Sequence, residues 1–175
     1  MPIIDAMLSE LEQETRTTRK LLERLPEDKL SWKPHPKSFS LGQLALHIAQ
    51  IPGGVASFVE QDTADAPEFQ QPEAASRAQT LEALEEGIAN AKRILSKMDD
   101  ARLMSSWRLV SNGEVVLEMP RVAFIRTILL NQIYHHRGQL SVYLRLLEVP
   151  VPSVYGPSAD ELPEFLQKQT TSSRR

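Results

Sequence analysis

The four histidines are the side chains of this chain best suited to metal chemistry, because the sequence contains no cysteine. His35 and His47 lie in the first third of the chain, and His135 and His136 are adjacent in the last third. Imidazole nitrogen is a ligand that zinc, nickel and iron(II) accept. The absence of cysteine excludes disulfides, thiolate zinc sites and cysteine nucleophiles.

Gln132 and His136 have the spacing that brings two side chains together on one helix, because residues four apart are neighbours on the helix surface. Projected at about 100° per residue, His136 falls near the middle of the apolar stripe of a predicted helix over residues 121–148, and Gln132 lies on the same face. That stripe consists of Val122, Ile125, Leu129, Ile133, Leu140, Tyr143 and Leu147. Helix bundles present metal ligands inward with this geometry.

His47 is a third candidate ligand, three residues after Leu44 at the edge of the apolar stripe of an earlier helix. If the two helices face each other, His47 meets Gln132 and His136, and two imidazoles with an oxygen donor and water suit zinc, nickel or iron(II). The alternative is that these polar side chains are only hydrogen-bonded in the core. His135 is expected towards the edge of the helix face and His35 in a loop.

Other function classes find little support in the sequence. A net charge of −3 and a pI near 5.8 argue against a nucleic-acid partner. No glycine-rich phosphate loop or nucleophile elbow is present, and no apolar run approaches the ~20 residues of a membrane span. We therefore expect a cytoplasmic protein. Asp99 and Asp100 are expected to end a helix, and Arg126, Arg137 and Arg145 to lie on a solvated or interface edge.

The predicted elements give an all-α fold, a four-helix bundle over residues 1–169 with a polar tail over 170–175. The helices are expected at residues 2–25, 40–60, 77–98 and 121–148, with a short one at 162–167. Ser40 and Ser76 each precede a glutamine by three residues, which predicts capping boxes. The Pro52-Gly53-Gly54 run predicts a kink or break in the second helix, and residues 61–75 are expected to form a loop. Asn112-Gly113 predicts a short β-hairpin over 105–118, before the last long helix.

Three segments carry a resemblance to a known family. They are WKPHPKSFSLGQLALH at 32–47, NQIYHHRGQLSVYLRLL at 131–147 and VPVPSVYGPSAD at 149–160. In sequence and spacing they resemble the DinB-like family, part of the DinB/YfiT-like metalloenzyme superfamily.

The resemblance implies a four-helix bundle of up-down-down-up topology, often a homodimer, with a divalent metal (Zn, Ni or Fe) held by three histidines. By position these correspond to His47, Gln132 and His136, so a glutamine stands where family members more often have histidine. Val142 and Leu146 are available for a dimer interface. Related bundles act on low-molecular-weight thiols.

Three functions stay open at this point. The first is a metal-dependent enzyme of the thiol-transferase or hydrolase type, with a small-molecule or thiol substrate. The second is a non-catalytic bundle that binds a small ligand, and the third is a structural dimeric bundle with a degenerate metal site.

Overall fold

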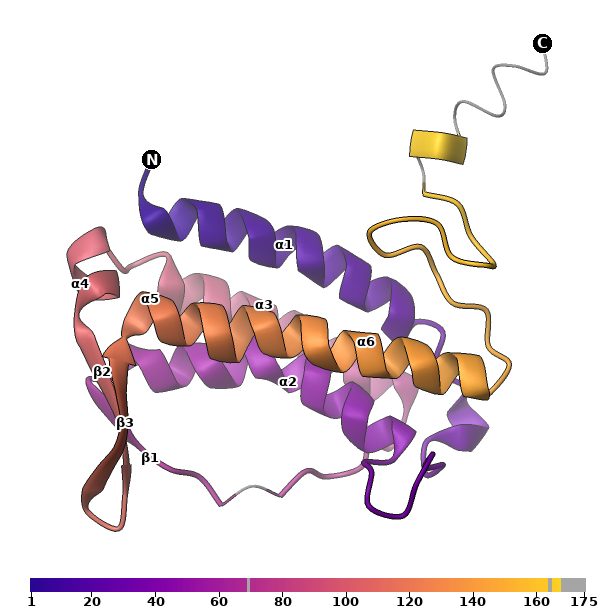
Figure 1. Ribbon diagram of the computed structural model, residues 1–175, viewed down its shortest axis with the longest axis horizontal. Helices are drawn as coiled ribbons and strands as arrows, with labels where there is room; N and C mark the ends of the chain where they lie inside the picture. The colour runs from indigo at the N-terminus through magenta and orange to yellow at the C-terminus, as the bar shows by residue number, and fades with distance from the viewer. Residues whose placement is uncertain (69, 164, 168–175) are drawn as a thin grey trace.

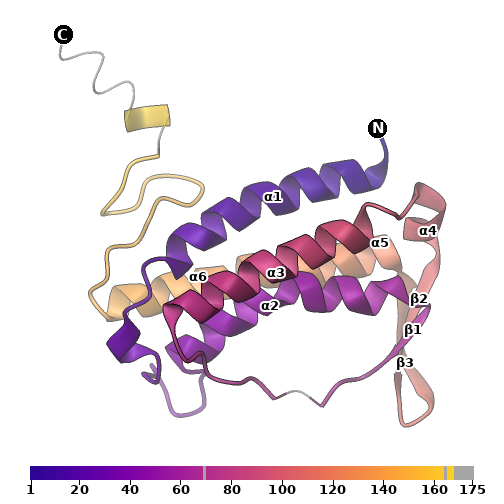
Figure 2. The same ribbon diagram turned by 180° about the vertical axis from the view of Figure 1, so that it is seen from behind.

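The computed structural model describes residues 1–68, 70–163 and 165–167. Within this part of the chain four long helices lie side by side, as Figures 1 and 2 show from opposite sides. They are α1 (Ile3–Leu22), α2 (Leu41–Glu60), α3 (Arg77–Leu95) and α6 (Asn131–Leu146). The predicted helical bundle is confirmed in this coarse form, while its up-down-down-up topology stays a prediction. None of the described helices combines the length and apolarity that a membrane span requires.

Short elements complete the fold at the ends of the long helices. η1 (Glu27–Lys29) follows α1, and α4 (Asp100–Met104) follows α3. Of the predicted helix over 162–167, residues 165–167 are helical and residue 164 lies outside the described residues, as does the predicted tail over 170–175.

α3 ends at Leu95, and Asp99 accepts a hydrogen bond from the backbone N–H of Arg102 at the start of α4. Asp99 and Asp100 therefore begin a helix instead of ending one.

Side-chain caps determine where two of the helices begin. The hydroxyl of Ser40 accepts a hydrogen bond from the backbone of Gln43, whose carboxamide accepts one from the backbone of Ser40, so the first predicted capping box is confirmed. Ser76 caps α3 in the same way, but the Gln79 carboxamide oxygen accepts from Ala75 instead. Of the two hydrogen bonds of the second predicted capping box, only the one accepted by the Ser76 hydroxyl is present.

The expected kink or break at Pro52 is not a break, because α2 continues as a helix through Pro52, Gly53 and Gly54. Proline removes one backbone donor from a helix interior and normally kinks it. Here α2 packs closely on α3, and a Cβ atom at Gly53 would lie 2.9 Å from the Cα atom of Gly87. This contact between two backbones explains how packing against α3 offsets the weak local propensity of α2.

The last predicted helix is interrupted near its start by a change of helix type. It opens with α5 (Arg121–Phe124), passes through the π-helix η2 (Ile125–Leu130) and continues as α6. One-turn π segments insert an extra residue into the helical repeat and recur at functional sites. The apolar stripe alone did not predict this irregularity.

A three-stranded sheet closes one end of the bundle. β2 (Ser106–Ser111) and β3 (Glu114–Pro120) form the predicted hairpin, with Asn112 and Gly113 both at positive φ in its turn. β1 (Thr63–Asp65) pairs in parallel with β2, although the sequence predicted a loop there. The described residues are thus mainly helical with a small mixed sheet. From β1, the described residues 66–68 and 70–76 run along α2 towards the opposite end of the bundle (Figures 1 and 2).

The buried side chain of Arg121 joins this sheet to the helices. Its solvent exposure is 0%. Its guanidinium donates hydrogen bonds to oxygen atoms of Val59, Gln61, Asp62, Ser105 and Ser106. A buried charge is tolerated when its donors are satisfied in this way. The end of α2, the start of β2 and the start of α5 are therefore held at one point.

Replacing Gly53 and Gly54 separately by alanine will test the contact between α2 and α3. We expect Gly53→Ala to lower the free energy of unfolding by about 1–3 kcal/mol, because the added methyl group meets the backbone of Gly87. Gly54→Ala is the matched control, since its Cβ meets no atom within 4 Å, and it should raise stability by up to about 1 kcal/mol. Urea denaturation measures both. Equal effects of the two substitutions would contradict this account.

The hydrogen bonds of Asp62 lead us to predict that the stability of the folded protein depends on pH. Hydrogen bonds from Arg102 and Arg121 hold the pKa of its carboxyl group below the ordinary value. The unfolded chain therefore takes up this proton at a higher pH than the folded chain, so the stabilisation is present above the ordinary Asp pKa and is lost as the pH falls below it. Thermal melting should show Asp62→Asn less stable than the native protein at pH 7, with the difference shrinking below about pH 4. Asp65→Asn is the control, and a constant difference across this range would refute the prediction.

Candidate metal and ligand site

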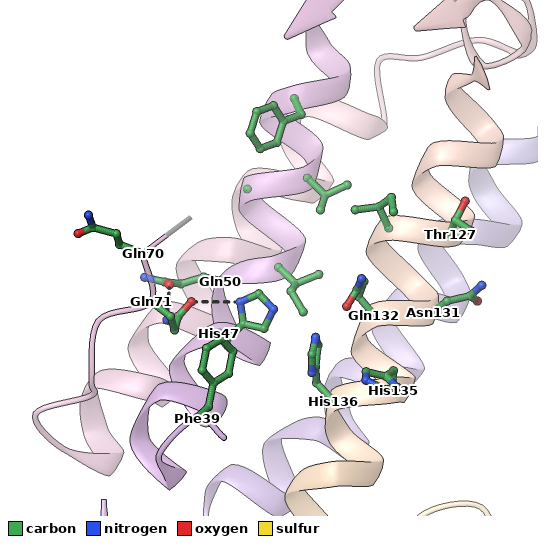
Figure 3. Close-up of a pocket in the computed structure, with 15 residues that line it drawn as sticks. Phe39, His47, Gln50, Gln70, Gln71, Thr127, Asn131, Gln132, His135 and His136 are labelled. Atoms are coloured by element: carbon green, nitrogen blue, oxygen red, sulfur yellow. Dashed lines mark hydrogen bonds between the residues drawn. The ribbon is translucent and has the colours of Figure 1, made fainter. Parts of the chain in front are cut away.

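A cavity of 960 Å³ lies between α2 and the continuous η2–α6 segment, and the loop before α3 covers one side of it (Figure 3). Its apolar lining consists of Phe39, Ile51, Gly54, Val55, Phe58 and Ile128. Its polar lining consists of His47, Gln50, Gln70, Gln71, Thr127, Asn131, Gln132, His135 and His136. Pockets of this size accept small organic molecules.

The three predicted site residues all line this cavity. The rings of His47 and His136 lie with their centroids 4.7 Å apart and their planes at 82°, and Gln132 is one helical turn from His136 (Figure 3). The predicted convergence of α2 and the last helix is therefore observed. The role of these residues as metal ligands stays a prediction.

The other two histidines lie as expected. His135 is exposed at the edge of the cavity, with its ring centroid 4.8 Å from that of His136. His35 is exposed in the loop before α2, where its Nδ1 accepts a hydrogen bond from the backbone of Lys37.

The sequence placed His136 closer to the core than it is. The buried line of α6 runs through Ile133, Arg137, Leu140 and Leu144, and His136 is half-buried beside it, facing α2. The prediction of a solvated Arg137 is wrong: its side chain is 3% exposed and forms an ion pair of 2.6 Å with the buried Glu14 of α1. Apolar spacing alone does not reveal such a pairing between distant residues.

Arg126 and Arg145 fit the prediction of a solvated edge. Arg126 is 49% exposed and pairs with Glu10, and Arg145 is 46% exposed and pairs with Asp160. Of Arg126, Arg137 and Arg145, only Arg137 is withdrawn from solvent.

Glutamine carboxamides hold both histidine rings in one tautomer. Nδ1 of His47 lies 3.1 Å from Oε1 of Gln71, whose Nε2 donates to oxygen atoms of Gln50 and Pro72. Because Oε1 of Gln71 can only accept, Nδ1 of His47 donates and Nε2 carries the lone pair.

The same arrangement occurs on α6. Nδ1 of His136 lies 2.8 Å from Oε1 of Gln139, one turn along the helix. In Figure 3 the nitrogen of His47 opposite Gln71 points towards Gln132 and His136. The sequence analysis named neither Gln71 nor Gln139, and Gln71 belongs to a loop whose packing no local pattern predicts.

Burial favours the neutral form of both rings. It lowers the pKa of His47 below the ordinary value, and the nearby His136 lowers it further, against the effect of the hydrogen bond with Gln71. Burial also lowers the pKa of His136, in spite of its hydrogen bond with Gln139. Neutral imidazole is the form that binds metals.

The cavity contains few side chains that could bind a metal ion. No group of three His, Cys, Asp or Glu side chains that could hold a metal ion occurs among the described residues. The cavity offers the facing imidazoles of His47 and His136, the exposed imidazole of His135 at its edge, and carboxamide oxygens, of which that of Gln132 is next to the two facing rings (Figure 3). Such a set can bind a borderline divalent metal, but more weakly than three imidazoles would.

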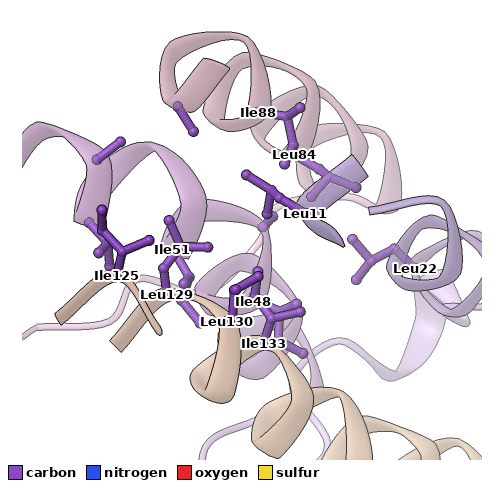
Figure 4. Close-up of a cluster of buried hydrophobic side chains, with 14 of the residues drawn as sticks. Leu11, Leu22, Ile48, Ile51, Leu84, Ile88, Ile125, Leu129, Leu130 and Ile133 are labelled. Carbon is purple, nitrogen blue, oxygen red and sulfur yellow. The ribbon is translucent and has the colours of Figure 1, made fainter. Parts of the chain in front are cut away.

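A tightly packed core supports the cavity from behind. Ile48 and Ile51 of α2 pack against Ile125, Leu129 and Ile133 of the facing segment (Figure 4). Ile51 is 7% exposed and also lines the cavity, so the two helices that carry the histidines share one hydrophobic contact. A packed core of this kind restricts the movement of the site.

Comparison with known proteins places the chain in a family. The sequence profile of the DinB family matches residues 2–170. The uncharacterised protein YrdA of Bacillus subtilis is 27% identical over 164 residues, which cover 93% of each chain.

Solved structures agree with this match. The crystal structure of a DinB-like protein from Bacillus cereus superposes with a TM-score of 0.65 at 24% identity, covering 86% of this chain and 97% of that one. A DinB-like protein from Bacillus subtilis, YjoA, gives a TM-score of 0.62 at 20% identity, with coverages of 89% and 99%. At identities below 25%, the solved structures show only that the fold is similar. The family is shown by the match to the sequence profile. The chain belongs to the DinB family.

Proposed function

We propose that this protein is a divalent-metal-dependent enzyme that acts on a small molecule in the cavity between α2 and α6. The observation that carries the proposal is the pair of neutral histidines, His47 and His136, 4.7 Å apart with Nε2 as the unprotonated nitrogen of each ring. Members of the DinB family are generally considered metal-binding, which supports the same conclusion.

His47 and His136 would hold the metal, with the carboxamide oxygen of Gln132 as a third donor. A bound dication lowers the pKa of a coordinated water or thiol and so produces a nucleophile at neutral pH. This chemistry is compatible with a thiol-transferase or a hydrolase, and low-molecular-weight thiols are candidate substrates.

Gln71 and Gln139 are assigned as positioning residues in this proposal. By accepting a hydrogen bond from Nδ1, each carboxamide holds its imidazole in the orientation and tautomer that a metal requires. Ile51 and Val55 form an apolar part of the wall beside the same region.

Gln132 favours a second candidate function, a non-catalytic protein that binds a small ligand. Its carboxamide is neutral and a poorer ligand than imidazole for zinc, nickel or iron(II). No carboxylate lines the cavity among the described residues, so a general acid or base of that kind is missing from its wall. Metal content distinguishes the two functions.

A homodimer is part of the proposal. Val142 and Leu146 lie one turn apart on α6 and are 56% and 57% exposed. Residues at this spacing form one apolar stripe, which a second copy of the chain would cover.

Elemental analysis of tag-free protein, purified without chelators and reconstituted with Zn²⁺, Ni²⁺ or Fe²⁺, is the direct test. We expect bound metal in the native protein and an affinity at least about tenfold lower in His47→Ala and His136→Ala. His35→Ala, outside the cavity, is the control. Gln132→His should bind more tightly than the native protein, because it supplies a third imidazole. A native protein that takes up none of the three metals would overturn the metal-dependent enzyme and favour the ligand-binding alternative.

Substitutions of Gln71 test separately whether this residue positions the His47 ring for metal binding. Gln71→Ala should weaken metal binding by about 10–100-fold, since the ring loses the acceptor that orients it. Gln70→Ala, in the same loop and the same cavity, is the matched control, and Gln71→Glu should restore binding because a carboxylate also accepts from Nδ1. Competition with a chelating dye measures the affinities. Equal affinities of Gln71→Ala and Gln70→Ala would remove Gln71 from the site.

A further inference from the structure

Gly54 is a glycine in the middle of α2 that helix packing does not explain. Glycine weakens a helix interior relative to alanine. At Gly53 the contact with Gly87 requires it, but a Cβ atom at Gly54 would meet no atom within 4 Å, and the residue is exposed. Because Gly54 has no side chain, the space beside the helix at this position stays open.

Two cavities share Gly54 in their lining. Gly54 and Phe58 line the 960 Å³ cavity that contains the histidines, and they also line a second cavity of 450 Å³. The second cavity extends to Thr63 and Ala64 in β1. A side chain at position 54 would project into the place where the two cavities adjoin.

The combined space is elongated, with different chemistry at its two ends. His47 and Phe58 line it from positions eleven residues apart on α2, which corresponds to about 16 Å along the helix axis. The imidazoles and the Gln132 carboxamide lie at the His47 end. Val55 and Phe58 line the stretch beyond, and the surface of the second cavity is mainly apolar.

The lining also carries no formal charge. Among the described residues that line either cavity, none is Asp, Glu, Lys or Arg. A charged group that entered the apolar part would lose hydration without gaining a counterion, which is unfavourable. The chemistry of the walls therefore selects an uncharged molecule.

We propose that the two cavities form one channel for an elongated, uncharged ligand with a hydrogen-bonding head group and an apolar chain. The head group lies at the His47 end, and the chain passes Gly54 and Phe58 into the second cavity. Gly54 is the specificity-determining residue, because a large side chain at this position would shorten the chain that fits. The inference rests on the proposed function only for the assignment of the head group to the histidine end.

Binding of a homologous series of straight-chain amides tests the channel. Butanamide, hexanamide and octanamide are titrated by calorimetry into the native protein, Gly54→Ala and Gly54→Phe. We expect the affinity of the native protein and of Gly54→Ala to rise about threefold to fourfold per added methylene. In Gly54→Phe the aromatic ring occupies the junction, so octanamide should bind no more tightly than butanamide. Octanoate and octylammonium should bind the native protein at least tenfold more weakly than octanamide.

The outcomes separate the channel from the metal site. Equal gains per methylene in Gly54→Phe and the native protein, or no gain in the native protein, would overturn the channel. Binding of octanoate as tight as that of octanamide would overturn the uncharged ligand. Metal content tests the histidines independently and should be the same in Gly54→Phe as in the native protein. Should Gly54→Phe fail to fold, Ser57→Phe fills the second cavity from another exposed position of α2 and should weaken octanamide selectively.

Discussion

The close contact between α2 and α3 is the constraint on which the rest of the structure depends. Gly53 and Gly87 allow the two backbones to approach, and α2 remains one helix although Pro52 removes a hydrogen-bond donor from its interior. His47, near the start of α2, and Phe58, near its end, consequently lie along one wall of the same cavity. A break at Pro52 would divide that wall, and the histidine end would no longer be aligned with the apolar end.

Two buried arginines hold the elements around this helix. Arg121 ties the end of α2 to the sheet through hydrogen bonds to Val59, Gln61 and Asp62. Arg137 ties α6 to α1 through its ion pair with Glu14. Because an unpaired buried charge is costly, each arginine favours one arrangement of its partners over the alternatives. The two contacts therefore restrict how α6 can shift relative to α1 and to the end of α2, and with it the position of His136.

Most features that depend on neighbouring residues were predictable from the sequence, and most features that depend on distant contacts were not. The capping box at Ser40 and the turn at Asn112-Gly113 involve residues within a few positions of each other. So does the i, i+4 relation of Gln132 and His136 on one helix. The continuity of α2, the strand β1 and the burial of Arg137 each depend on residues far along the chain, and periodicity carries no information about them. Gln71 belongs to the same group, since a loop residue 24 positions away from His47 becomes its hydrogen-bond partner.

Position 132 determines what the histidine pair can do. His47 and His136 are neutral and share a tautomer, so both can act as ligands or as hydrogen-bond acceptors at neutral pH. A histidine at position 132 would complete a set of three imidazoles, whose affinity for a borderline metal exceeds that of two imidazoles and a carboxamide. The carboxamide that is present can instead donate hydrogen bonds, which an imidazole bound to a metal at the same nitrogen cannot do. In the proposed site, Gln132 would thus bind a metal less tightly than histidine but could recognise an uncharged polar group, which fits the absence of charged residues from the described lining of the cavity.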